Sequence, residues 1–152
     1  MKFLKVEPHG TAKLFYLSSA FWFLMGALEG LLDAAHLTAP ELVNNVAWLV
    51  FGRVRPMHTS TMIVGFVGSA LLAAPHYYLP TLLKTPLFSE RLGKLSLWVW
   101  NLSIAAGTAT LALGHSQSRE YAEWIWPVDV GVLLAFALIA VNFALTGARR
   151  KE

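Results

Sequence analysis

The chain has 152 residues, of which 56% are hydrophobic and 14% are charged, and its formal net charge is +3. Soluble domains carry about 25% charged residues, so this composition indicates an integral membrane protein rather than a soluble or nucleic-acid-binding one. There is no cysteine, which excludes disulfides, cysteine-ligated metals and covalent haem attachment through C-x-x-C-H.

Four apolar runs are long enough to cross a bilayer, for which a helix needs roughly 20 residues. We place these spans at about 14–32, 57–79, 92–113 and 128–146. No repeat or soluble region interrupts them. The sequence therefore predicts an all-α integral membrane protein with four transmembrane helices in a single membrane domain, residues 1–152.

The basic residues predict the orientation of the spans. Three clusters fall on one side of the predicted membrane: Lys2, Lys5 and Lys13, then Lys84, Arg91 and Lys94, then Arg149, Arg150 and Lys151. Because basic loops stay inside, we expect both termini to be cytoplasmic and segments 33–56 and 115–127 to be outside, in a bacterial or archaeal cytoplasmic membrane. Segment 41–51 would form a short interfacial helix.

Polar groups inside the spans need partners in protein rather than in lipid. Glu29 and Asp33 lie one turn apart on the first span, and Asn142 lies on the fourth. We expect a neighbouring helix, or another subunit, to supply these partners.

His58 is the strongest candidate functional residue. It follows Arg53, Arg55 and Pro56, and the spacing predicts a helix that starts at the membrane surface with the imidazole about one turn inside. A histidine there is either solvated among lipid headgroups or is a functional site. Neutral imidazole is a good iron ligand whose other nitrogen needs an acceptor, such as a nearby hydroxyl or a backbone carbonyl, and arginine suits haem propionates.

The face of this span supports a haem next to His58. Small residues at Gly65 and Ser69 would let a flat cofactor or another helix approach the backbone. His76 is 18 residues from His58, roughly 27 Å along a helix, so the two histidines cannot bind one metal. We expect the helix to bend or fray at Pro75.

A second constellation lies between the third and fourth spans. Glu120 and Glu123 are three residues apart and would share a face if the segment were helical. Paired carboxylates suit a hard cation such as calcium. The alternative is an interfacial turn with solvated glutamates, anchored by Trp124 and Trp126.

At these two constellations the sequence resembles the main subunit of the haem–copper oxidases, most closely the C-family of cbb-type cytochrome c oxidases. Residues 51–59 read F-G-R-V-R-P-M-H-T, similar to the family's F-G-R-[LV]-R-P-[LM]-H-T. Residues 118–123 read S-R-E-Y-A-E and are followed by Trp126 and Asp129, similar to K-E-Y-A-E-x-x-W-x-[DE].

The resemblance implies a role for each matched residue. His58 would ligate a low-spin haem b, and Arg53 and Arg55 would lie near its propionates. Glu120 would help to bind calcium, with a less defined role for Glu123. The family's second haem ligand, high-spin haem and copper site have no counterpart in this sequence. The resemblance therefore implies one part of a split subunit within a larger helix bundle, with a partner membrane chain carrying the rest and a cytochrome c donating electrons.

Two alternatives remain open at this stage. Nitric oxide reductases share the low-spin haem histidine and a calcium site with the oxidases. A non-enzymatic structural or assembly protein without haem would also retain these motifs.

Overall fold

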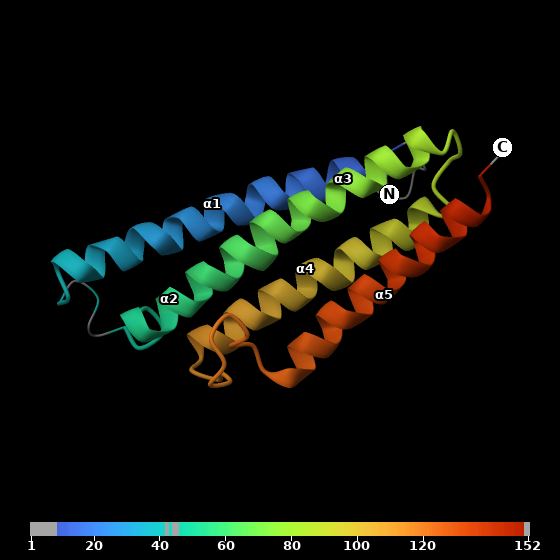
Figure 1. The fold of residues 1–152 in the computed structure, drawn as a ribbon. Helices are drawn as coiled ribbons and strands as arrows, with labels where there is room; N and C mark the ends of the chain where they lie inside the picture. Colours follow the sequence, from blue (N-terminus) through green and yellow to red (C-terminus); the bar gives the residue numbers. More distant parts are fainter. Residues whose placement is uncertain (1–8, 42, 44–45, 151–152) are drawn as a thin grey trace, which may run out of the picture.

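The computed structural model describes residues 9–41, 43 and 46–150. Within these residues the structure is helical and contains no strand, which confirms the predicted all-α class. Four helical rods lie side by side (Figure 1), and each is long and apolar enough to span a membrane. This confirms the predicted four-helix membrane architecture.

The second rod is continuous but contains three segments, the middle one a π-helix. The elements in order are α1 Gly10–Thr38, α2 Phe51–Ser60, the π-helix η2 Thr61–Gly68, α3 Ser69–Leu82, α4 Glu90–Ala112 and α5 Trp126–Ala148. The rods alternate in direction, so α1 begins and α5 ends at the same end of the bundle (Figure 1). We call this the terminal end, and the opposite end, where α1 ends and α2 begins, the distal end.

The rods extend beyond most of the predicted spans. α1 continues to Thr38, and the second rod begins at Phe51, so Arg53, Arg55 and Pro56 lie inside a helix. His58 is thus about two turns from the start of its helix rather than one. Gly10 and Ala148, the first and last helical residues, lie at the same end, as the basic clusters predict, although Lys2, Lys5 and Lys151 lie outside the described residues.

Two local expectations need correction. α3 continues through Pro75 and Pro80 to Leu82, so the helix does not fray at Pro75, and a bend there stays a prediction. Membrane helices tolerate proline where neighbouring groups can bond the carbonyls that it leaves free. The described residues of 41–50 form turns, with the amide of Leu49 bonded to the carbonyl of Val46, rather than an interfacial helix.

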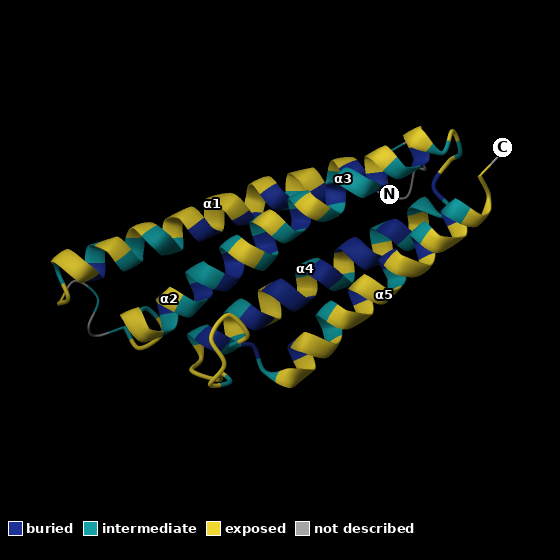
Figure 2. Cartoon of the chain, in the orientation of Figure 1, coloured by how far each residue is buried: buried dark blue, intermediate teal, exposed yellow. Residues whose placement is uncertain are grey.

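Buried residues follow the faces between the rods, while exposed residues cover the outer faces (Figure 2). The fully buried side chains include Phe15, Trp100 and Ile104, which come from α1 and α4. Large apolar side chains such as Leu31 and Leu133 remain exposed, at 68% each. Apolar faces of this extent need lipid or further protein to cover them.

Asn142 finds hydrogen-bond partners within the chain. Its Oδ1 accepts a hydrogen bond from the Ser89 amide and its Nδ2 donates to the Ser89 carbonyl, both at 3.0 Å. Thr146, one turn further along α5, accepts from the Phe88 amide at 2.9 Å. These bonds hold the α3–α4 loop against α5 at the terminal end.

Candidate functional site

His58 points from α2 toward α1. Its Nδ1 lies 2.7 Å from the carbonyl oxygen of Gly26. Because a carbonyl can only accept, Nδ1 carries the proton in the neutral ring, and the lone pair stays on Nε2. This arrangement orients a metal-binding histidine and makes it more basic. A backbone carbonyl was one of the acceptors that the sequence analysis expected.

Two glycines of α1 make room for this contact. A Cβ at Gly30 would lie 2.7 Å from Cε1 of His58, and a Cβ at Gly26 would lie 2.6 Å from Sδ of Met62. Side chains are not found at such separations, so Gly30 leaves the space that the imidazole occupies, and Gly26 leaves space for the Met62 side chain next to it. The sequence analysis missed both residues. Their G-x-x-x-G spacing, typical of close helix contacts in membranes, was the available signal.

Arg53 reaches from α2 to the end of α4. Its Nη1 donates to the carbonyl of Ala112 at 2.8 Å, one of the carbonyls that a helix leaves unpaired at its C-terminus. Its Nη2 lies 2.8 Å from where a Cβ on Gly114 would be, and Gly114 has a φ of +86°. The cation therefore complements the negative end of the α4 dipole.

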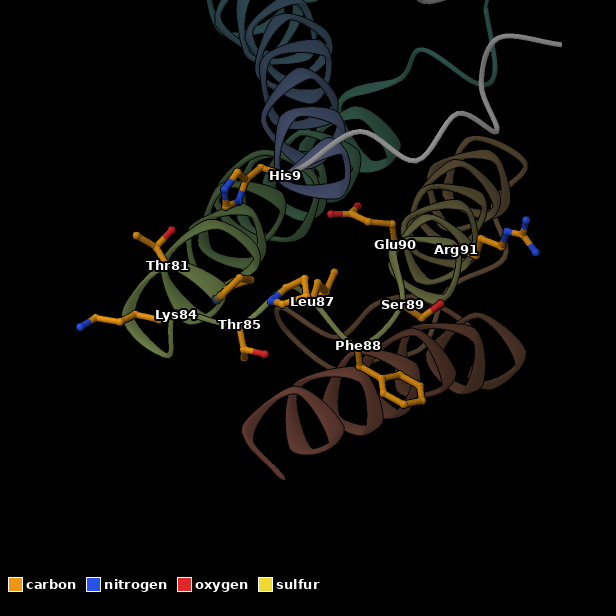
Figure 3. A pocket seen from close by; sticks show the side chains of 11 residues that line it. His9, Thr81, Lys84, Thr85, Leu87, Phe88, Ser89, Glu90 and Arg91 are labelled. Atoms are coloured by element: carbon orange, nitrogen blue, oxygen red, sulfur yellow. The ribbon is translucent and has the colours of Figure 1, made fainter. Parts of the chain in front are cut away.

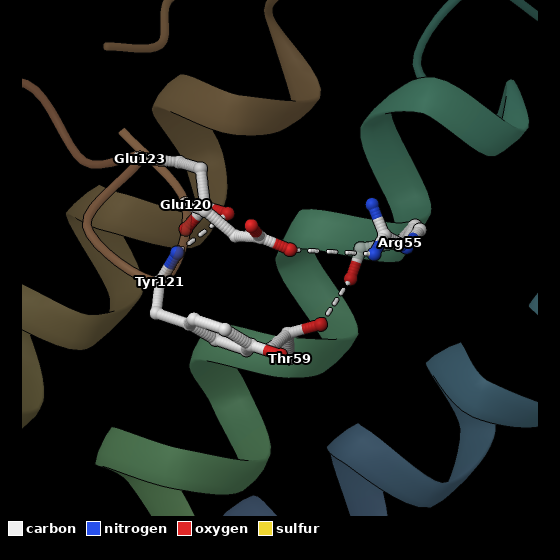
Figure 4. A network of polar contacts seen from close by, with 5 residues as sticks. All are labelled: Arg55, Thr59, Glu120, Tyr121 and Glu123. Carbon is white, nitrogen blue, oxygen red and sulfur yellow. Dashed lines mark hydrogen bonds and ion pairs between the residues drawn. The ribbon is translucent and has the colours of Figure 1, made fainter. Parts of the chain in front are cut away.

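Arg55 is more loosely held. Its Nη2 lies 3.9 Å from Oε1 of Glu120, and the two side chains are 63% and 71% exposed. Figure 4 shows this pair with Thr59, whose hydroxyl donates to the carbonyl of Arg55 at 2.9 Å. An ion pair this exposed contributes about 0–1 kcal/mol, so Arg55 keeps its capacity to bind another anion.

The segment with Glu120 and Glu123 consists of turns, so the two glutamates do not share a helical face. Oε1 of Glu123 accepts from the Tyr121 amide at 3.1 Å, while its Oε2 is buried without a hydrogen-bond partner. In the part of the chain that the structure describes, no three acidic or histidine side chains converge on a metal position. These residues alone do not complete a calcium site.

Glu29 and Asp33 lie on the same helix as the glycines that contact His58. One oxygen of each carboxyl, and the buried hydroxyl of Thr61, have no hydrogen-bond partner. The sequence analysis expected partners for these acids. Part of their hydrogen-bonding capacity remains unused within the described residues.

The small-residue face of the second rod holds aromatic side chains of this chain, not an open slot. A Cβ at Gly65 would lie 2.9 Å from Cβ and Cγ of Trp22. The hydroxyl of Ser69 accepts from Nε1 of Trp100 at 2.9 Å. Of the two uses that the spacing allowed, approach of another helix is the one observed at these residues.

His76 lies far from this site, near the terminal end. It is 1% exposed, and Phe15 stacks against its ring while Phe143 meets it edge-on. Its Nδ1 bonds to the carbonyl of Leu72 at 2.7 Å, and its Nε2 is buried without a partner. The ring is enclosed by aromatic side chains and shares no site with His58.

The terminal end also holds the larger of two hollows described in the structure, about 760 Å³. In Figure 3 Lys84 and Arg91 extend away from it, while Glu90 turns toward α1. There Glu90 accepts from the amide and hydroxyl of Thr11 at 2.9 and 2.6 Å. A second hollow of about 280 Å³ lies between Ser60 and Val64 of the second rod, residues 121–124 and α5.

Comparison with known proteins places these features in a family. Residues 10–152 match the family model described as cytochrome C and quinol oxidase polypeptide I. The chain is 36% identical over 137 residues to the Cbb3-type cytochrome c oxidase subunit CcoN1 of Stutzerimonas stutzeri, covering 90% of this chain and 29% of that protein.

Two further relatives show the same pattern. The chain is 36% identical over 136 residues to a cytochrome c oxidase subunit 1 homolog of Agrobacterium tumefaciens (strain T37), covering 90% of this chain and 25% of that protein. It is 34% identical over 148 residues to cytochrome c oxidase subunit 1 of Rhodobacter capsulatus, covering 94% and 27%. The chain thus spans less than a third of the length of these curated relatives.

Proposed function

The chain belongs to the cytochrome c and quinol oxidase polypeptide I family, and on that premise we propose that it is a membrane subunit of a haem–copper respiratory oxidoreductase. In this proposal His58 is an axial ligand of the low-spin haem b. The observation that carries it is the 2.7 Å contact between Nδ1 of His58 and the Gly26 carbonyl, because it leaves the Nε2 lone pair for iron.

The haem, when bound, would supply one-electron transfer, and this chain would hold and orient it. The Gly26 carbonyl, bonded to Nδ1, and the space left by Gly30 would orient the imidazole. Arg55, which is exposed and only weakly paired, would turn from Glu120 to a propionate. Arg53 would remain on the Ala112 carbonyl through Nη1 and offer its other N–H donors, since guanidinium has five.

For calcium, we propose that this chain supplies only some of the ligands. Glu120 and the unpartnered Oε2 of Glu123 would each offer an oxygen. Calcium takes six to eight oxygen ligands, so we propose that most of them come from propionates or from residues outside this chain.

The remaining chemistry would lie on a partner membrane chain. We propose that this partner supplies the second axial ligand, the high-spin haem and copper, and that a cytochrome c subunit or soluble cytochrome c donates the electrons. The complex would reduce oxygen to water and take protons from the cytoplasm. Both termini of the present chain would face that side of a bacterial or archaeal cytoplasmic membrane.

The first test is spectroscopic. We expect the complex, solubilised from its native membrane in mild detergent, to show a b-type haem in its reduced-minus-oxidised spectrum. His58→Ala should abolish the low-spin signal because the axial ligand is lost. His36→Ala is the matched control, since His36 also bonds a carbonyl through Nδ1, that of Leu32 at 2.8 Å, but would carry no iron.

Each outcome separates the alternatives. An unchanged spectrum in His58→Ala would refute the ligand assignment. A colourless wild-type protein without a co-purifying membrane chain would favour the structural or assembly role. Metal analysis of a coloured complex distinguishes copper, as in an oxidase, from non-haem iron, as in a nitric oxide reductase.

A further inference from the structure

A polar cluster joins α1 to α4 in the middle of the bundle. The hydroxyl of Ser18 and Nε1 of Trp22 both donate to Oδ1 of Asn101, each at 2.7 Å. Nδ2 of Asn101 donates to the carbonyl of Leu97 on its own helix at 2.9 Å. That second bond fixes which way the amide faces, so its oxygen is aimed at α1.

The same turn of α1 is also held against the second rod. The hydroxyl of Ser19 donates to the carbonyl of Phe66 at 3.0 Å. Trp22 occupies the space that a side chain at Gly65 would fill, and only 7% of Trp22 is exposed. Polar bonds and small residues are the features that set helix register inside membranes. Together these contacts define the position of α1 against both of its neighbours.

Gly26 lies one turn beyond Trp22 on α1, four residues along, so both residues share a face. A shift of α1 by a single residue would move the Gly26 carbonyl by about 1.5 Å and rotate it by roughly 100°. Its hydrogen bond to His58 would not survive, because such bonds span only about 2.7–3.2 Å. The position of the carbonyl therefore depends on the contacts one turn earlier.

We propose that Trp22 and Asn101 are positioning residues for His58. By fixing the register of α1 they hold the Gly26 carbonyl on Nδ1–H, and so set how strongly Nε2 donates electrons. A stronger hydrogen bond makes the imidazole a more basic ligand, which favours the ferric state of the iron. The effect on iron rests on the proposed function, whereas the effect on the hydrogen bond does not.

The test compares two tryptophan variants in the purified complex. Trp22→Phe removes the indole N–H but keeps an aromatic ring near Gly65. The matched control, Trp100→Phe, removes an indole N–H that joins α4 to Ser69 of α3 at 2.9 Å. One readout is the Nδ1–H proton resonance of His58 in ¹⁵N-histidine-labelled, reduced protein. The other is the midpoint potential of the low-spin haem.

We expect Trp22→Phe to move the Nδ1–H resonance upfield and the potential in the positive direction, because the hydrogen bond weakens. Asn101→Leu should do the same more strongly, since it removes the acceptor of both α1 donors. Trp100→Phe should change neither readout. If Trp22→Phe does not assemble, Ser18→Ala removes the other donor and serves in its place.

The proposal is overturned if Trp22→Phe and Asn101→Leu leave both readouts unchanged, or if the two tryptophan variants shift them equally. A wild-type complex without b-type haem would refute the proposed function instead. The proton resonance, measured in that same preparation, would still decide whether Trp22 and Asn101 control the His58 hydrogen bond.

Discussion

At the scale of single residues, the position of His58 depends on the absence of a side chain at Gly30. An added Cβ would lie 2.7 Å from Cε1 and 3.0 Å from Nδ1 of the imidazole. We expect Gly30→Ala to push the ring away from the Gly26 carbonyl and to lower the haem content of the purified complex by at least half. The ratio of haem absorbance to protein measures this.

Gly52→Ala provides the control for that substitution. Gly52 lies in the first turn of α2, six residues before His58, and an added Cβ would have no atom within 4 Å. Alanine favours a helix by roughly 0.5–1 kcal/mol over glycine, so haem content should be unchanged. An equal loss of haem in both variants would show that any substitution near the haem site lowers haem binding. It would refute a specific role for the contact between Gly30 and His58.

The two arginines beside His58 have different roles despite their closeness in sequence. Arg53 bonds a helix-terminal carbonyl at 2.8 Å, whereas Arg55 makes only an exposed ion pair at 3.9 Å. From sequence spacing we assigned both arginines to the haem propionates, because the sequence shows that both are charged but not which groups their guanidinium groups contact. It does not show that the end of α4 comes within range of one guanidinium.

At the scale of elements, Asn142 and Thr146 of α5 both bond to the α3–α4 loop, and Asn142 makes two of these hydrogen bonds. Asn142 is fully buried and makes two hydrogen bonds to the backbone of Ser89. We expect Asn142→Leu to lower the free energy of unfolding by about 1–3 kcal/mol, because it leaves buried backbone groups unpaired. Thermal unfolding of the detergent-solubilised complex measures the loss.

Ser103→Ala separates this effect from a general sensitivity of the bundle. The hydroxyl of Ser103 bonds only to the Val99 carbonyl of its own helix, at 2.8 Å, so its removal should cost little. Hydrogen exchange of the Ser89 amide should speed up in Asn142→Leu alone. Full retention of protection in that variant would contradict the proposed anchor.

The ends of the helices were harder to predict than the helices themselves. Apolar runs identify the spans because the bilayer interior requires them. They do not detect the last helical turns of α1, residues 33–38, or the first of α2, residues 51–56. These residues are helical although many of their side chains are polar, because such side chains can point toward other helices or water. The π-helix Thr61–Gly68 could not be predicted either. Its hydrogen bonds join residues five apart instead of four, and the amino-acid composition of the segment does not indicate this difference.

At the scale of the whole molecule, the motif around His58 was predictable while its surroundings were not. An ionisable residue such as His58 in a membrane helix indicates a functional site from the sequence alone. Trp22, Asn101 and the glycines act only through contacts across three rods, and single residues of these types are common in membrane helices. What covers the exposed apolar faces of α1 and α5 was also not predictable, because the sequence alone does not distinguish a face that contacts lipid from one that contacts a partner helix.

The orientation of the bundle can be tested directly because the chain contains no cysteine, so one introduced thiol reports one position. Ser116 is exposed at the distal end and Thr81 is exposed at the terminal end. The positive-inside rule predicts that a membrane-impermeant maleimide labels Ser116→Cys in intact cells or spheroplasts, and labels Thr81→Cys only in inverted vesicles. Labelling in the opposite pattern would place both termini outside, and His58 would then lie near the cytoplasmic surface, away from a cytochrome c docked outside.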